Sequence, residues 1–211
     1  MTHTLHRVGN LENLDGDYVF LCMPSKDINH VGSGPKLRRF FEIALKHNPV
    51  KIGDARLGNE YHQGGIDKIL ENVEDRAVTQ AVFNNKEAVV AMMKDLKEED
   101  LGLSVVLSGL GDHVRECCSK ADLKVHTVNQ SLGRWGKTEL LPPQHLLEIA
   151  TMCGHAMVAV NFIQEMIDDV KKGRKTAEQA AEEMFKPCMC GIFNTDRAVR
   201  LIKEIIAENM D

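Results

Sequence analysis

The sequence predicts an α/β protein: a mainly parallel sheet flanked by helices, followed by a small all-helical C-terminal module. Two observations lead to this prediction. Over residues 1–141, short apolar runs alternate with amphipathic stretches, which is typical of strands and helices that alternate around a parallel sheet. From Pro142 onward every periodic stretch has helical spacing. We therefore divide the chain into residues 1–141, an α/β ligand-binding domain, and residues 142–211, a helical metal-binding module.

The composition limits the classes of protein to which the chain can belong. Its 211 residues, 43% hydrophobic and 27% charged, are enough to bury a core. A net charge of −5 argues against a nucleic-acid partner. No apolar run approaches the roughly 20 residues that a membrane span needs, so we expect no membrane association. The first residues lack the apolar segment of an export signal, so we expect a cytoplasmic protein whose six cysteines are reduced.

Five short apolar strands are expected in the first domain. The fourth of them, LSVVL, is rich in β-branched residues, which favours a central position in the sheet. The strands are Tyr18–Met23, Val50–Ile52, Thr79–Phe83, Leu103–Leu107 and Lys124–Val128. The helices expected between and after them are Pro35–His47, Gly65–Asn72, Lys86–Leu96 and Asp112–Lys120.

Four helices are expected in the second domain. Proline suits a first helical turn, so Pro143 indicates where the first of them begins. Thr176 and Gln179 have the spacing of a capping box at the start of the third. A module of about 70 residues is small for a core of its own, so it must dock on the first domain or be held by a metal centre. The four helices are Pro143–Met152, Val158–Lys172, Ala177–Phe185 and Thr195–Asn209.

Two close pairs of potential metal ligands lie in this second domain. Three thiols with one imidazole suit zinc or an iron–sulfur cluster. In a continuous helix, positions two apart point about 200° apart, so the first pair can converge only if the chain breaks near Gly154. Pro187 and Gly191 flank the second pair and indicate a loop. The four residues are Cys153, His155, Cys188 and Cys190.

The stretch from MCGHAMVAV to RLIKEII, about 60 residues, resembles the small [2Fe–2S] domain of bacterioferritin-associated ferredoxin. In that family a C-x-C turn leads into a helix, a helical hairpin follows, and C-x-x-C opens a last helix. Here VKKGRKTAEQAAEEM resembles the hairpin and DRAVRLIKEII the closing helix, with C-x-H and C-x-C at the two motifs. Cys153 and Cys188 therefore match the family directly, His155 by substitution and Cys190 by a shift of one residue.

The resemblance implies an intracellular iron–sulfur protein that transfers electrons or senses redox state. If it is an enzyme, we expect an oxidoreductase, and a redox partner protein would exchange electrons with the cluster. Two alternatives stay open: the same four residues could hold structural zinc, or an enzyme could act through the loops of the first domain alone. The sequence also leaves open whether two copies of the chain pair.

Glycine-rich loops follow several predicted strands and suggest a pocket for a small anionic metabolite. In an open parallel sheet, ligands bind beyond the carboxyl ends of the strands, where backbone N–H groups and helix N-termini favour negative charge. Arginine and lysine in the same loops would add cationic donors. The candidate ligand-binding residues are Gly32, Ser33, Gly34, Arg56, Ser108, Gly109, Gly111, Arg134 and Lys137.

The other cysteines and the first histidines receive structural interpretations. Cys22 lies within a predicted strand and should be buried in the core. Cys117 and Cys118 are adjacent in a predicted helix, so one should face the core. His3 and His6 are interpreted as surface histidines, with a role as ligands as the alternative.

Overall fold

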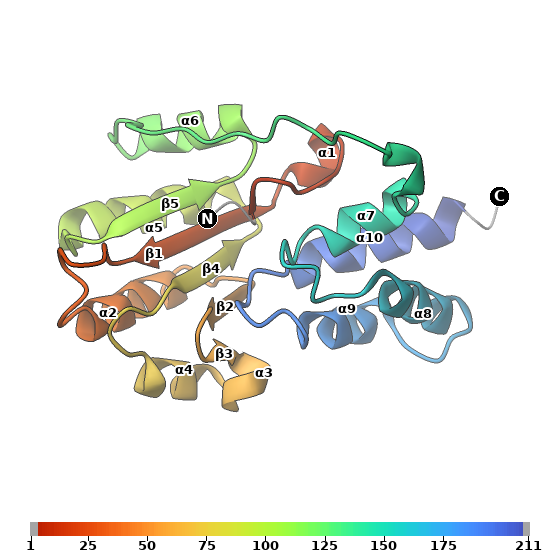
Figure 1. Ribbon diagram of the computed structural model, residues 1–211, viewed down its shortest axis with the longest axis horizontal. Coiled ribbons are helices and arrows are strands. Elements are labelled where there is room, and N and C mark those ends of the chain that lie inside the picture. Colours follow the sequence, from red (N-terminus) through yellow and green to blue (C-terminus); the bar gives the residue numbers. More distant parts are fainter. Residues whose placement is uncertain (1–3, 209–211) are drawn as a thin grey trace.

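The computed structural model describes residues 4–208 and contains one five-stranded sheet (Figure 1). The strands are β1 (Tyr18–Met23), β2 (Lys51–Asp54), β3 (Gly58–Asn59), β4 (Thr79–Phe83) and β5 (Ser104–Ser108). Their order across the sheet is β3-β2-β4-β1-β5, and every pair of neighbours is antiparallel. The prediction of a mainly parallel sheet is therefore wrong.

The reason lies in how two βαβ units interleave. β1 and β2, joined through α2 (Gly34–Leu45), run in the same direction but are separated by β4. β4 and β5, joined through α5 (Lys86–Glu99), also run in the same direction but are separated by β1. Interleaving makes each neighbouring pair antiparallel and yields the split βαβ, or ferredoxin-like, topology. Alternating strands and helices along a sequence are equally compatible with this arrangement and with a parallel sheet.

The expectation that LSVVL forms a central strand is also wrong. It forms β5, which lies at the edge of the sheet and leaves Val105 39% exposed. The longer strands that are buried are β1, up to its last residue, and β4, and the two residues of β3 are buried as well. Lys124–Val128 forms no strand in the described part of the chain.

The two faces of the sheet are covered by different layers. Tyr18, Phe20 and Cys22 of β1 face a core formed with α2, α5 and two further helices, α4 (Ile66–Asn72) and α6 (Gly111–Lys120). The alternate residues Val19 and Leu21 belong to a second core. This alternation follows from the two-residue period of a strand and places two apolar layers on one sheet.

The second core joins the sheet to the C-terminal helices, which lie beside its end in Figure 1. Their shared cluster includes Leu21, Val82, Ile163 and Phe193, all fully buried. The module therefore docks on the first domain, as its small size required. The helices are α7 (Gln144–Ala150), α8 (Val160–Lys171), α9 (Ala177–Phe185) and α10 (Thr195–Glu208).

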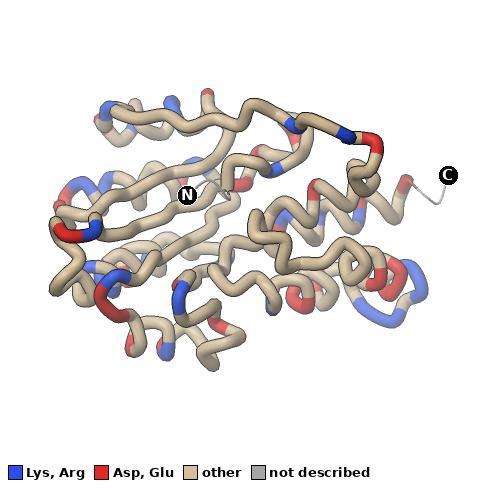
Figure 2. Tube along the Cα trace, viewed as in Figure 1, with Lys and Arg blue, Asp and Glu red and all other residues tan. Residues whose placement is uncertain are grey.

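Local signals account for several ends of these elements. The predicted capping box of Thr176 and Gln179 is present at the start of α9. The basic run at the turn between α8 and α9 is solvent-facing and is seen at the right of Figure 2. Within residues 4–208 no helix is long and apolar enough to cross a membrane. Short elements that the sequence did not predict are α1 (Leu11–Leu14), α3 (Glu60–Gln63) and a 3-10 turn at Thr138–Leu140.

Candidate metal centre

The helical periodicity is interrupted at the position where a shared site requires a break. α7 ends at Ala150 and α8 begins at Val160. Between them Gly154 has φ +70° and Ala156 has φ +55°, both in the left-handed region. That conformation costs a non-glycine residue about 1–2 kcal/mol, so the structure holds Ala156 there against its preference. Cys153 and His155 consequently lie in a loop rather than on opposite sides of a helix.

The second pair lies in the loop between α9 and α10, which packs against β2 at very short range. A Cβ atom on Gly53 would lie 2.5 Å from the carbonyl oxygen of Cys190. A Cβ atom on Gly191, where φ is +72°, would lie 2.5 Å from the carbonyl oxygen of Ile52. Glycine at both positions lets the two backbones touch, and this contact fixes where Cys188 and Cys190 lie.

Asn59, at the end of β3, holds the same loop through hydrogen bonds. Its Nδ2 donates to the carbonyl oxygens of Phe185 and Lys186 at 3.3 Å and of Cys188 at 2.8 Å. Its Oδ1 accepts from the backbone N–H groups of Tyr61 and His62 at 2.9 and 3.3 Å, capping α3. One buried side chain therefore links the sheet edge to the chain around Cys188.

The four predicted ligands contact one another in a row. The Cys188 side chain is hydrogen-bonded to both Cys153 and Cys190. Cys190 Sγ lies 3.6 Å from His155 Nδ1. The three cysteines are buried, whereas His155 is exposed at the surface. We call this set the Cys/His row; the fold has brought together residues from two separate loops.

Contacts within the row shift the pKa values of Cys153 and Cys188 in opposite directions. A hydrogen bond from Cys188 lowers the pKa of Cys153 to about 6; burial opposes this, and the backbone N–H groups of His155 and Met157 reinforce it. The same thiol contacts, together with burial, raise the pKa of Cys188 well above its usual value. Cys153 is the member of the row whose thiolate form is favoured, and metals bind thiolates rather than thiols.

Within residues 4–208, no three His, Cys, Asp or Glu side chains are placed so that they could hold a metal ion as they stand. In a tetrahedral zinc site with Zn–S of about 2.3 Å and Zn–N of about 2.0 Å, sulfur and nitrogen ligands lie about 3.5 Å apart. The Cys190–His155 contact of 3.6 Å is close to that separation. For all four side chains to share an ion, the thiols would have to turn toward a common point.

A buried polar cluster supports both loops, and no motif in the sequence predicts it. The Arg7 side chain, 6% exposed, pairs with Asp17, and its Nη2 donates to the carbonyl oxygens of Met152 at 3.1 Å and Ile192 at 2.6 Å. Arg197 pairs with the same carboxylate at 3.0 Å. Burial alone would raise the pKa of Asp17, but the two arginines lower it overall. These contacts join segments far apart in the chain, so no local sequence pattern predicts them.

The predicted anion-binding residues do not form one pocket, because the strands are antiparallel. The chain that follows β1 and β2 leaves the end of the sheet where Cys22, Thr79 and Asp54 pair. The chain that follows β5 leaves the opposite end, where Ser108 pairs with Val19. For a strand rise of 3.4 Å, the three residue steps from Val19 to Cys22 separate these two ends by roughly 10 Å. Gly32–Gly34 and Arg56 are therefore separated from Ser108–Gly111.

The glycines after β1 bind an anion that the chain itself supplies. Asp75 accepts hydrogen bonds from the backbone N–H groups of Gly34 and Gly32, both at 2.7 Å, and these bonds lower its pKa. Ser33 Oγ instead donates to the carbonyl oxygen of His30 at 2.9 Å. Arg56 Nη1 donates to the Asp75 carbonyl oxygen at 2.8 Å.

The remaining candidates have local contacts of their own. Ser108 Oγ is hydrogen-bonded to Thr4 Oγ1 at 2.7 Å. A Cβ atom on Gly109 would lie 2.8 Å from the Tyr18 ring, and Gly111 begins α6. Arg134 and Lys137 lie in an exposed loop, where Arg134 Nη2 contacts Gln144 Oε1 at 3.4 Å.

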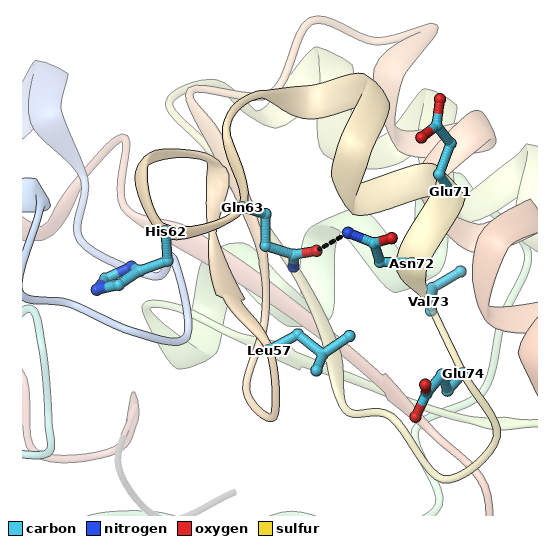
Figure 3. Close-up of a pocket in the computed structure, with 7 residues that line it drawn as sticks. All are labelled: Leu57, His62, Gln63, Glu71, Asn72, Val73 and Glu74. Atoms are coloured by element: carbon cyan, nitrogen blue, oxygen red, sulfur yellow. Dashed lines mark hydrogen bonds between the residues drawn. The ribbon is translucent and has the colours of Figure 1, made fainter.

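A surface hollow of about 560 Å³ lies beside α4, next to Leu57 and Gln63 (Figure 3). Gln63 and Asn72 are hydrogen-bonded to each other across it at 3.2 Å. The His62 ring points away from the other residues in Figure 3, and its Nδ1 lies 2.9 Å from Asn59 Oδ1. The hollow thus brings no reactive pair of side chains together.

The other cysteines behave as predicted. Cys22 is fully buried in the core, and burial raises its pKa to about 12. Cys117 is buried and Cys118 half-buried, so one of the adjacent pair faces the core. His6 Nδ1 lies 3.1 Å from Ser131 Oγ at the surface. His3 lies outside the described residues.

Comparison with known proteins adds no assignment: no family model matches the chain, and neither a curated protein nor a solved structure matches it significantly.

Proposed function

We propose that the protein binds a single metal ion, zinc first of all, through Cys153, His155, Cys188 and Cys190. The Cys/His row carries this proposal, since three buried thiols and an imidazole from two loops contact one another. An ion there would tie the α7–α8 loop to the α9–α10 loop and add a cross-link to the buried cluster that the C-terminal helices already form. Such a site needs reduced cysteines, as in the cytoplasm.

The [2Fe–2S] cluster is the second candidate. The resemblance to bacterioferritin-associated ferredoxin supports it, as do the N–H groups of His155 and Met157 that bond the Cys153 sulfur. A cluster would supply one-electron redox chemistry and would require a partner that gives or takes electrons. A single ion needs less space among these four side chains than two irons with two sulfides, and for this reason we place zinc first.

A small anionic ligand is no part of this proposal. The loop with Gly32–Gly34 and the loop with Ser108–Gly111 lie at opposite ends of the sheet, and the Asp75 carboxylate accepts the hydrogen bonds of Gly32 and Gly34.

The deciding measurement is the zinc, iron and acid-labile sulfide content of protein prepared without oxygen. We expect one zinc per chain in the wild type and its loss in Cys188→Ser. Cys118→Ser is the matched control, because this half-buried thiol of α6 lies outside the Cys/His row. It should retain the metal.

Each alternative result has a distinct meaning. Iron with equimolar labile sulfide and visible absorption would show that the site holds the cluster instead of zinc. Wild-type protein with no stoichiometric metal of either kind would overturn both candidates.

A further inference from the structure

The segment before β1 reaches both cysteine loops through one side chain. Arg7 Nη2 donates to the carbonyl oxygen of Met152, the residue before Cys153, and to that of Ile192, two residues after Cys190. Its Nη1 meanwhile pairs with Asp17. A planar guanidinium can serve several acceptors in one fixed geometry, which a lysine ammonium cannot reproduce.

The rest of the same segment is docked by further contacts around the site. Val8 N–H donates to Thr151 Oγ1 at 3.0 Å, two residues before Cys153. The Val8 carbonyl oxygen accepts from Arg197 Nη2 at 2.7 Å. Thr4 contacts Ser108 at the end of β5. Residues 4–8, which we call the N-terminal strap, thus lie across the backbone that carries the predicted ligands.

We propose that Arg7 is a positioning residue for the metal centre, holding the two cysteine loops at the separation that a shared ion requires, so that strap docking and metal binding stabilise each other. This inference rests on the proposed function. Arg7 touches the loops but not the ion. Coupling between two binding events is reciprocal. If the docked strap strengthens metal binding, then a bound metal must strengthen docking of the strap by the same free energy.

The first test is the rate at which zinc-loaded protein loses zinc to a chromogenic chelator. Arg7→Lys keeps a positive charge beside Asp17 but cannot donate to both carbonyls. Losing hydrogen bonds worth about 1.4 kcal/mol weakens binding about tenfold. We therefore expect Arg7→Lys to release zinc about tenfold faster than the wild type. Arg200→Gln is the matched control. In the wild type, Arg200 donates to the carbonyl oxygens of Asn13 and Asp15 and does not contact the cysteine loops. The control variant should release zinc at the wild-type rate.

The second test measures how docking of the strap depends on zinc, in the wild type and in Arg7→Lys. Amide hydrogen exchange of residues 4–8 in wild-type protein should be slow with zinc and faster after its removal, and in Arg7→Lys this dependence should be weaker. Zinc release from Arg7→Lys at the wild-type rate, or strap exchange that ignores zinc, would overturn the inference while leaving the metal site standing. A wild type that binds no metal would overturn the proposed function itself.

Discussion

Asp17 is a buried charge held by three side chains. Its carboxylate is paired with Arg7 and Arg197 and also accepts from Asn194 Nδ2 at 3.0 Å, while its side chain is only 1% exposed. Two arginines around one carboxylate leave a net positive charge in the interior, which the carbonyl oxygens of Met152, Ile192, Val8 and Asn13 partly balance. Without the carboxylate, the buried guanidinium groups of Arg7 and Arg197 would repel each other with no anion between them.

We expect Asp17→Asn to lower the free energy of unfolding by about 3–5 kcal/mol, the usual cost of breaking a buried ion pair. Urea unfolding followed by circular dichroism measures it. Asp112→Asn is the control: its pair with Arg115 is exposed, so we expect a change below about 1 kcal/mol. Equal losses in the two variants would contradict the role assigned to Asp17.

The pH dependence of this difference has a definite sign. The pKa of Asp17 is lower in the folded protein than its usual 3.8, so its contribution is fully present above that value. The contribution is lost as pH falls through the lowered folded pKa. The stability gap between wild type and Asp17→Asn should therefore stay constant from pH 7 to 5 and narrow below about pH 4. A gap that widened on acidification would refute this assignment.

At the scale of elements, the loop between α9 and α10 is set by backbone contact with β2. Both Gly53 and Gly191 lack the Cβ atom that would collide with the opposite strand or loop. The contact places Cys188 and Cys190 beside the sheet, and Asn59 then fixes the Cys188 carbonyl oxygen. The position of the second ligand pair is consequently a property of the sheet as much as of the helices.

Gly191→Ala and Gly173→Ala separate this contact from simple backbone strain. Both glycines have nearly the same positive φ, +72° and +68°, but a Cβ at Gly173 meets nothing within 4 Å. The left-handed conformation costs alanine about 1–2 kcal/mol at either site, and overpacking adds about 1–3 kcal/mol at Gly191 alone. Thermal unfolding should show the larger loss for Gly191→Ala, together with weaker metal retention. Equal losses of stability in the two variants would mean that the α9–α10 loop can move away from β2 without cost.

At the scale of the whole molecule, one sheet carries two apolar layers. Leu21 belongs to the buried cluster that the sheet shares with α7–α10 and the loops between them, and the other face packs against α2, α4, α5 and α6. Unfolding of the C-terminal helices would uncover buried strand residues, so the two regions share their stability. We therefore expect one cooperative transition rather than two.

Leu21→Ala tests this coupling. Leu21 is fully buried between the sheet and the C-terminal helices, so its truncation should cost about 2–5 kcal/mol. Hydrogen exchange should then speed up in β4 and in α9 together. Val105→Ala, on the exposed edge strand, serves as the control and should cost far less. Faster exchange confined to the helices would show that the two regions unfold separately.

Much of the local structure was predictable from the sequence. Tyr18–Met23, Thr79–Phe83 and Ala177–Phe185 have the predicted bounds, because apolar periodicity and capping are local properties. The topology was not predictable, because interleaved and side-by-side βαβ units produce the same alternation. Lys124–Val128 shows the same difficulty: its pattern suits a strand, but it forms none beside the open edge at β5.

The sequence by itself determined which residues could bind a metal: three cysteines and a histidine in two pairs, with glycine and proline where the chain must turn. Only the tertiary structure decided that the two pairs meet, because that depends on contacts between residues distant in the chain. Gly53 against Cys190, Asn59 on Cys188, and Arg7 across Met152 and Ile192 are such contacts. The tertiary structure also separated the candidate anion-binding loops, since strand direction, and not loop composition, sets the end of the sheet at which each loop lies.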